Sequence, residues 1–300
     1  MNTPPNEALE RPTRPMYWSV RRELWENRSI YIAPLIVAAF VLFGSFFSVI
    51  GLPRRMQNLP ANDPEKAHAI IVKPFSFAPA PIIFVTLIVG IFYSLDALYG
   101  ERRDRSILFW KSLPVSDRTA VLAKACIPII VLPLVGFVLG QIVQLMLLML
   151  STVVLLAHRM NPAAAVGEFR WFQELLVMIY GLTVHALWFA PIYAWLLLVS
   201  AWAKRTPLLW AVLPPIIIGL FEKLVFNTTY FGLLLKYRVT GAMTEAFGID
   251  PSKHNSGVID RVGQLSPIRF LAAPGLWLGL LFAAGCLIAA IRLRRYREPI

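Results

Sequence analysis

Six stretches of this chain continue for 16 to 33 residues without a charged side chain, and this pattern restricts the fold more than any other feature. The clearest are Tyr31–Leu52, Pro74–Leu95 and Phe270–Ile291, each of 22 residues. A helix needs about 20 apolar residues to cross the hydrocarbon core of a bilayer, which is about 30 Å thick. We therefore predict six membrane-spanning helices, at about 31–52, 74–96, 125–157, 175–203, 206–226 and 270–291.

The composition excludes the main alternatives to a membrane protein. Hydrophobic residues make up 57% of the chain and charged residues 15%, against roughly 45–50% and about 25% in ordinary soluble domains. A disordered chain would need low hydrophobicity and high charge. The predicted class is an all-α polytopic membrane protein, with a disordered tail at 1–15 and a single transmembrane domain at 16–300.

The fifth predicted span is the weakest, because Glu222 and Lys223 interrupt its apolar run. The run reaches a full span only if it continues to Phe226, with the charged pair at one surface of the membrane. The first span follows almost thirty polar residues and exceeds the usual apolar core of a signal peptide. We expect that span to stay in place as an anchor.

The distribution of basic residues sets the expected orientation. With both termini in the cytoplasm, the inner segments carry 17 Lys and Arg residues and the longer outer segments carry 12. The higher basic density favours cytoplasmic termini. The net charge of +12 lies in short segments between apolar runs, so it indicates contact with anionic lipid rather than nucleic acid.

The segment 16–29 has the pattern of a helix that lies in the headgroup layer. Met16, Tyr17, Val20 and Leu24 share one helical face with the aromatic residues Trp18 and Trp25. Arg21 interrupts that face. Aromatic rings beside arginines are typical of helices at a membrane interface.

Polar residues inside the predicted spans are few and therefore informative. Gln141 and Gln144 stand three residues apart, and His185 lies near the middle of the fourth span. Two interpretations stay open: hydrogen bonds between helices, or the lining of a translocation cavity. The candidate pathway residues are Gln141, Gln144, Tyr180, His185 and Trp188. Glu222 and Lys223 are either interfacial residues or an outer gate.

The sequence contains no motif for chemistry of its own. It lacks GxxxxGK[ST], HExxH, CxxC and GxSxG, and its four histidines have no partner at the spacing of a metal site. Cys126 and Cys286 lie in apolar runs as expected of core residues. We expect neither catalysis nor a metal or cofactor on this chain, so energy for transport would come from another chain or an ion gradient.

The most specific pattern is the segment 99–118, which we call the elbow. A charged group at 101–105 leads into the apolar residues 107–110, Leu113 and Pro114 break the helix, and Ser116 is placed to cap the next one. Such a segment suits docking of a protein partner; the alternative is an amphipathic loop that rests on lipid. We expect its charges at the membrane edge, where single ion pairs contribute about 0–1 kcal/mol.

The order of charged cluster, Ser106, apolar stretch, Leu113-Pro114-Val115-Ser116 and a following helix with Leu122 and Lys124 resembles the permeases of type-2 ATP-binding-cassette (ABC) exporters. In that family a six-span subunit begins with an interfacial helix, and the loop between spans two and three is the coupling helix that contacts the ATPase. Two permease subunits assemble with two nucleotide-binding subunits. Short re-entrant helices lie between spans five and six, here the outer loop 227–269.

The resemblance implies a function, partners and a location. It implies an exporter subunit without its own nucleotide site, a separate ATPase subunit that binds ATP and Mg, and a second copy or a related permease. The aromatic residues of the spans favour an apolar or amphipathic substrate, moved by alternating access. The implied location is the inner (plasma) membrane of a bacterium. The implied ATPase-coupling residues are Glu101, Arg102, Arg103, Asp104, Ser106, Phe109, Trp110, Leu113, Pro114 and Ser116.

Two departures from the family pattern concern recognition of the ATPase. Arg105 stands where members often have glycine, and Asp117 stands where arginine is common. Two other functions remain open at this stage: an intramembrane enzyme acting on lipid, and a membrane sensor or assembly subunit that transports nothing.

Overall fold

The computed structural model describes residues 14–57, 75–112, 115–161, 171–248, 263 and 265–296. In these ranges every regular element is a helix and none is a strand. Five helices are long and apolar enough to cross a membrane, and there are six candidate spans if the bent pair α11 and α12 is counted as one. The structure therefore confirms the all-α polytopic membrane class. The expected tail to residue 13, Leu113 and Pro114 lie outside the described residues.

The helices of the described residues follow in chain order. Their bounds are α1 Pro15–Glu26, α2 Ser29–Ile50, α3 Leu52–Gln57, α5 Ala80–Asp96, α6 Tyr99–Arg103, α7 Ile107–Ser112, α8 Asp117–Cys126, η1 Ile127–Val131, α9 Leu132–Ala157, α11 Trp171–Trp188, α12 Ala190–Trp202, α13 Pro207–Phe226, α14 Tyr230–Phe247, α15 Pro267–Ala272 and α16 Pro274–Tyr296.

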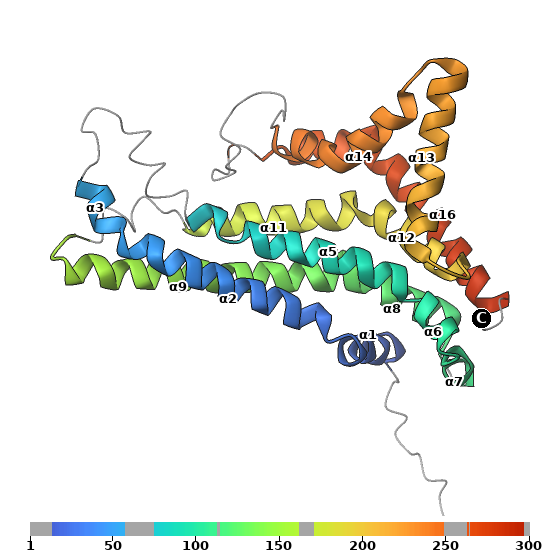
Figure 1. The fold of residues 1–300 in the computed structure, drawn as a ribbon, viewed down its shortest axis with the longest axis horizontal. Helices are drawn as coiled ribbons and strands as arrows, with labels where there is room; N and C mark the ends of the chain where they lie inside the picture. The colour runs from blue at the N-terminus through green and yellow to red at the C-terminus, as the bar shows by residue number, and fades with distance from the viewer. Residues whose placement is uncertain are drawn as a thin grey trace, which may run out of the picture.

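Most spans run along the long axis of the molecule and form one bundle (Figure 1). Side-chain contacts join Glu23 of α1, Glu101 of α6, Lys124 of α8 and Arg294 of α16, so these four helices meet at the same end. We call it the Glu101 end. The helix α3 lies at the opposite end.

The third span belongs to a continuous helical stretch of 41 residues, Asp117–Ala157, with a wider π-helical turn at η1. Pro133 has no N–H to donate, and the N–H of Leu132 binds the carbonyl of Ile127, five residues earlier. The wide turn therefore accommodates the proline while the helix continues.

The fourth span is bent by 43° between α11 and α12. Pro191, the second residue of α12, lacks the N–H that would continue the hydrogen-bond ladder of α11. The break therefore lies at Trp188 and Phe189, near the middle of the span.

The fifth span, α13, continues past Glu222 and Lys223 to Phe226, as the sequence predicts for a full-length span. Figure 1 shows that α13 stands away from the bundle, across its long axis. Only 6% of the most apolar 18-residue stretch of α13 is buried inside the chain. Most of its side chains are therefore exposed and available to lipid or to another protein.

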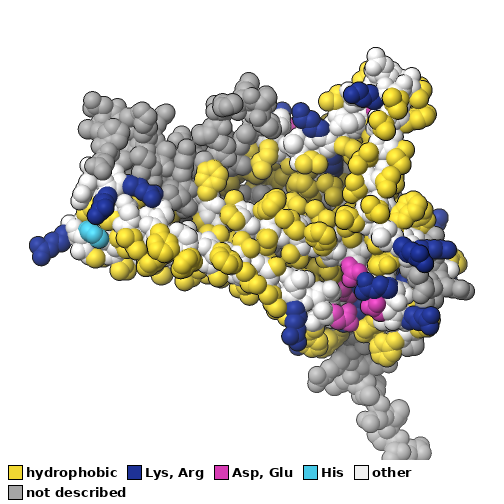
Figure 2. Space-filling view, in the orientation of Figure 1, with side chains coloured by type: hydrophobic (Ala, Val, Ile, Leu, Met, Phe, Trp, Pro, Cys, Tyr) yellow, Lys and Arg dark blue, Asp and Glu magenta, His cyan; other side chains and the backbone are white. Residues whose placement is uncertain are grey.

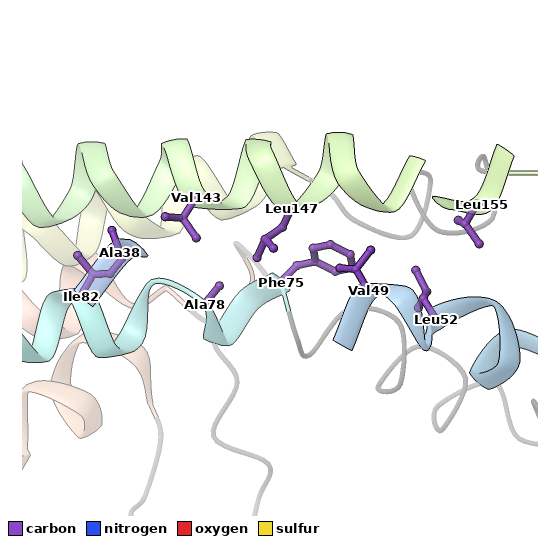
Figure 3. Packing of buried hydrophobic residues seen from close by; sticks show 9 residues of the cluster. All are labelled: Ala38, Val49, Leu52, Phe75, Ala78, Ile82, Val143, Leu147 and Leu155. Atoms are coloured by element: carbon purple, nitrogen blue, oxygen red, sulfur yellow. The ribbon is translucent and has the colours of Figure 1, made fainter. Parts of the chain in front are cut away.

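An apolar core joins α2, α5 and α9 (Figure 3). Its buried members are Ala38, Val49, Leu52, Phe75, Ala78, Ile82, Val143, Leu147 and Leu155. Gly136 and Gly140 of α9 let the neighbouring segments approach closely: a Cβ at Gly140 would lie 3.0 Å from the Cβ of Pro79, and one at Gly136 would lie 3.1 Å from Thr86. Small residues at such contacts are typical of packing between membrane helices.

The surface agrees with a membrane location. In the view of Figure 2, hydrophobic side chains cover the middle of the bundle, and lysine and arginine side chains gather toward the ends. Large apolar residues on the outer faces include Phe40, Phe43, Phe84 and Met149, each more than 60% exposed.

We predict that Gly140→Val destabilises the bundle while Gly44→Val does not. The added side chain at Gly140 meets the rigid ring of Pro79, and overpacking of this kind costs roughly 1–3 kcal/mol. Gly44, on α2, has nothing within 4 Å of its Cβ position. Thermal unfolding in detergent measures the difference, and equal melting temperatures for the two variants would contradict the packing.

Candidate partner-docking site at the Glu101 end

Charged side chains from four helices form a buried cluster, which we call the Glu101 cluster: Arg22, Glu23, Glu101, Lys124 and Arg294. Glu101 lies 3.2 Å from Arg22, 3.2 Å from Lys124 and 3.3 Å from Arg294. Lys124 lies 2.9 Å from Glu23. The cluster thus joins α1, α6, α8 and α16.

The cluster is well shielded from solvent, and its charges nearly balance. Glu23 is 1% exposed, Lys124 2%, Arg294 5% and Glu101 8%. Asp117, at the edge of the cluster, also accepts a hydrogen bond from Arg294, so three carboxylates face three cations. Burying an ion costs several kcal/mol unless partners and hydrogen bonds compensate it. This mutual compensation is what permits charge at such depth.

Glu23 has the most complete set of partners in the cluster. One carboxylate oxygen accepts from Arg22 at 2.6 Å and Lys124 at 2.9 Å, and the other accepts from the hydroxyl of Tyr93 at 2.8 Å. Burial acts to raise the pKa of Glu23, but the cations of Lys124 and Arg22 outweigh it and lower the pKa below its ordinary value of 4.5. Glu23 is therefore a carboxylate at neutral pH.

The first part of the elbow is held against the end of α12. The guanidinium of Arg102 donates to the carbonyls of Ser200 at 2.8 Å and Ala203 at 2.6 Å. The hydroxyl of Ser200 accepts from the backbone N–H groups of Leu98 and Tyr99. These bonds fix the start of α6 on the fourth span.

The second helix of the elbow, α7, presents apolar side chains outward. Leu108 and Phe109 are 59% and 60% exposed. Trp110 is half-buried, with its ring beneath the guanidinium of Arg22 at 4.0 Å and 4.9 Å from the ring of Phe109. Arg22 in turn belongs to the Glu101 cluster. The buried charges thus position the aromatic pair of α7.

The structure divides the elbow charges, which the sequence places together at the exposed membrane edge. Arg103, Asp104 and Arg105 are exposed, whereas Glu101 and Arg102 are buried and bind helices of this same chain. The expectation of 0–1 kcal/mol for each charge is therefore wrong for Glu101 and Arg102. Burial removes the solvent screening on which that figure rests.

Two further residues of the elbow have clear structural partners. Ser106 donates weakly to the carbonyl of Glu101 at 3.4 Å. Ser116 caps α8, because its hydroxyl accepts from the backbone N–H of Thr119 at 3.1 Å. The cap predicted from the sequence is confirmed.

Arg105 and Asp117 both have clear structural features. Arg105 adopts a φ of 57°, in the left-handed region that favours glycine. Asp117 begins α8, where a negative charge is favourable, and binds Arg294 of α16. The backbone at Arg105 therefore keeps a shape suited to glycine, while Asp117 adds a contact to the last helix.

The candidate pathway residues lie in three separate groups and do not line one continuous surface. Gln141 donates to Gln144 at 3.0 Å, and Gln144 donates to the carbonyl of Phe75 at 3.3 Å. The bond from Gln144 to Phe75 joins two different spans, as expected if these glutamines form hydrogen bonds between helices. Their role in transport stays a prediction.

His185 links the two halves of the fourth span near the wide turn of the third. Its Nε2 lies 3.2 Å from the hydroxyl of Tyr193 on α12, and its ring lies close to the backbone of Pro128. The ring also packs against Phe189, with 5.0 Å between the ring centres.

Tyr180 and Trp188 bind α14. The hydroxyl of Tyr180 donates to the carbonyl of Ala246 at 3.2 Å, and the indole of Trp188 donates to the carbonyl of Arg238 at 2.8 Å. Both rings also pack against Phe270. These two candidates therefore lie together, apart from the glutamines.

Glu222, a candidate for the outer gate, caps the start of α14. Its carboxylate accepts from the hydroxyl of Thr228 and from the backbone N–H groups of Tyr230 and Phe231, at 2.7 to 2.8 Å. Lys223 is exposed. The carboxylate thus fixes the turn between α13 and α14, and a gating role stays a prediction.

Sequence reasoning missed Glu23, Lys124, Arg294 and Ser200 as members of this site. Lys124 carried a signal, because it stands one residue before a 33-residue uncharged run, where a charge needs a partner. Comparison with known proteins gave no further assignment: no family model, no curated protein and no solved structure matches this chain.

We predict that Glu23→Gln lowers the free energy of unfolding by roughly 3 kcal/mol at neutral pH, because it leaves buried cations without their partner. The lowered pKa of Glu23 means that its contribution is present above pH 4.5 and is lost as pH falls through the folded-state pKa. The variant should therefore lose less stability on acidification than the unmodified protein.

The matched control is Asp104→Asn, at an exposed carboxylate paired with Arg103. Denaturation in detergent between pH 3 and pH 7 makes the comparison. If both variants unfold like the unmodified protein across this range, the Glu101 cluster does not stabilise the fold.

Proposed function

We propose that this chain is the membrane-spanning permease subunit of an ATP-driven exporter that moves an apolar or amphipathic substrate. The observation that carries the proposal is α7: an outward apolar surface of Leu108 and Phe109, positioned through Trp110 and Arg22 by the Glu101 cluster. An exposed apolar surface on a firmly held segment is typical of a protein interface.

Several features support an ABC exporter over other membrane proteins. The chain has no nucleotide-binding loop, so an ATPase would be a separate subunit that binds ATP and Mg. The left-handed backbone of Arg105 fits the glycine that this family often has there. The six-span pattern and the helices between spans five and six also agree with the resemblance.

In the proposed mechanism, the movement of the ATPase is transmitted to the spans through the elbow. Closure of the partner ATPases would displace α7, and the buried ion pairs would carry that displacement to α1, α8 and α16 together. The wide turn at η1 and the break between α11 and α12 are the places where the spans could bend. A second copy of the chain, or a related permease, would complete the pathway.

We predict that Leu108→Ala combined with Phe109→Ala abolishes retention of the ATPase. Truncating aromatic anchors of an interface costs roughly 2 kcal/mol or more, which corresponds to at least about tenfold weaker binding. The full chain is co-expressed with the nucleotide-binding subunit encoded at its own locus and purified in mild detergent. The amount of ATPase that co-purifies and its rate of Mg-ATP hydrolysis are then measured.

The matched control is Ile83→Ala combined with Phe84→Ala, an adjacent aliphatic–aromatic pair exposed on α5 within the second span. This variant should retain the ATPase. If the α7 variant folds and keeps its ATPase with normal hydrolysis, α7 is not the docking surface and rests on lipid instead.

A further inference from the structure

Arg238 of α14 is a cation beside the break in the fourth span. Its guanidinium carbon lies 4.8 Å from the ring centre of Trp188, the last residue of α11. One terminal nitrogen, Nη1, donates to the carbonyl of Gly275 at 3.1 Å, on α16. The side chain thus lies between α11, α14 and α16.

The hydrogen-bonding capacity of Arg238 is largely unused. Its Nε and Nη2 are buried and have no hydrogen-bond partner in the described part of the chain. No carboxylate there pairs with it, since the nearby Glu245 binds Arg269 at 3.2 Å and Tyr237 at 3.4 Å. Two other arginines differ in this respect: the half-buried Arg22 and the buried Arg294 both bind carboxylates.

The packing leaves a space that suits the guanidinium. A Cβ on Gly279 would overlap both terminal nitrogens of Arg238, and a Cβ on Gly275 would overlap the ring of Tyr237. These two glycines stand four residues apart on one face of α16, so that face admits a cation where any larger residue would exclude it. Trp188 and Tyr237 form aromatic walls, 5.4 Å apart between ring centres.

Two buried nitrogens without an acceptor are costly, because buried donors in proteins nearly always have one. The N-terminus of α12, two residues after Trp188, adds positive potential in the same region. Both features favour an anion. The break of a spanning helix is also where transporters of other folds bind substrate.

We propose that Arg238 binds the anionic head of an amphiphile that this permease carries, a phosphate or carboxylate on an apolar chain. The assignment as cargo rests on the proposed function; the binding site itself does not. The apolar chain would lie against the aromatic cluster of Tyr180, Phe247 and Phe270. Nε and Nη2 of Arg238 are buried in this structure, so entry of the anionic head requires α14 to separate from α16.

The test measures binding of radiolabelled dodecyl phosphate to the full chain in phosphatidylcholine nanodiscs, without any ATPase. We expect saturable binding that dodecanol at the same concentration does not displace. Arg238→Gln should weaken binding at least about tenfold, because a charge-assisted hydrogen bond is lost. Arg238→Lys should keep part of the affinity, since it keeps the charge.

The matched control is Arg269→Gln, which removes an exposed guanidinium that already has a carboxylate partner; it should bind as the unmodified protein does. Thermal unfolding supplies a second readout. Dodecyl phosphate should raise the melting temperature of the unmodified protein but not that of Arg238→Gln. A purely structural Arg238 would instead give a less stable variant with unchanged affinity, which would overturn the proposal.

Two further arms identify the source of the anion. Competition by phosphatidylglycerol in the nanodisc would support a membrane lipid as the natural occupant, and competition by inorganic phosphate would show that the head alone suffices. Equal displacement by dodecanol would overturn the proposal. The binding test contains no ATPase, so it does not depend on the outcome of the ATPase-retention experiment. Equally, absence of dodecyl phosphate binding would not contradict the proposed docking surface on α7.

Discussion

The arrangement of this chain depends on the mutual neutralisation of buried carboxylates and cations at one end of its bundle. Glu23 and Glu101 come from helices separated by two spans in the sequence, yet both contact Lys124. Burying either carboxylate without its cations would be costly, and the cations likewise need the carboxylates. Because these ion pairs join α1, α6, α8 and α16, we expect removal of any one member to destabilise several helices at once.

The Glu101 cluster explains how a short segment can present a defined surface to a partner. An isolated helix of six residues such as α7 is not stable in water. Here the bonds of Arg102 to α12 and the stacking of Arg22 on Trp110 hold it in place. The exposed side chains of α7 thus need not be ordered by the partner on binding, which lowers the entropic cost of docking.

The sequence predicts the spans well because the thickness of the bilayer fixes their length, and it predicts the cap at Ser116 because capping is local. It does not predict that Glu101 and Arg102 turn inward, because their partners are distant in the chain and only tertiary packing brings them together. For the same reason, Arg238 reads as part of an outer loop. The structure instead places it in α14, against α11 and α16.

The most direct test of this account is hydrogen exchange of the backbone amides of 99–112 in purified chain, with and without Glu101→Gln. If the Glu101 cluster orders the elbow, the substitution should speed exchange there at least about tenfold while leaving 132–157 unchanged, since local opening follows local stability. Asp104→Asn should change neither region. Unchanged exchange of 99–112 in folded Glu101→Gln would contradict the account.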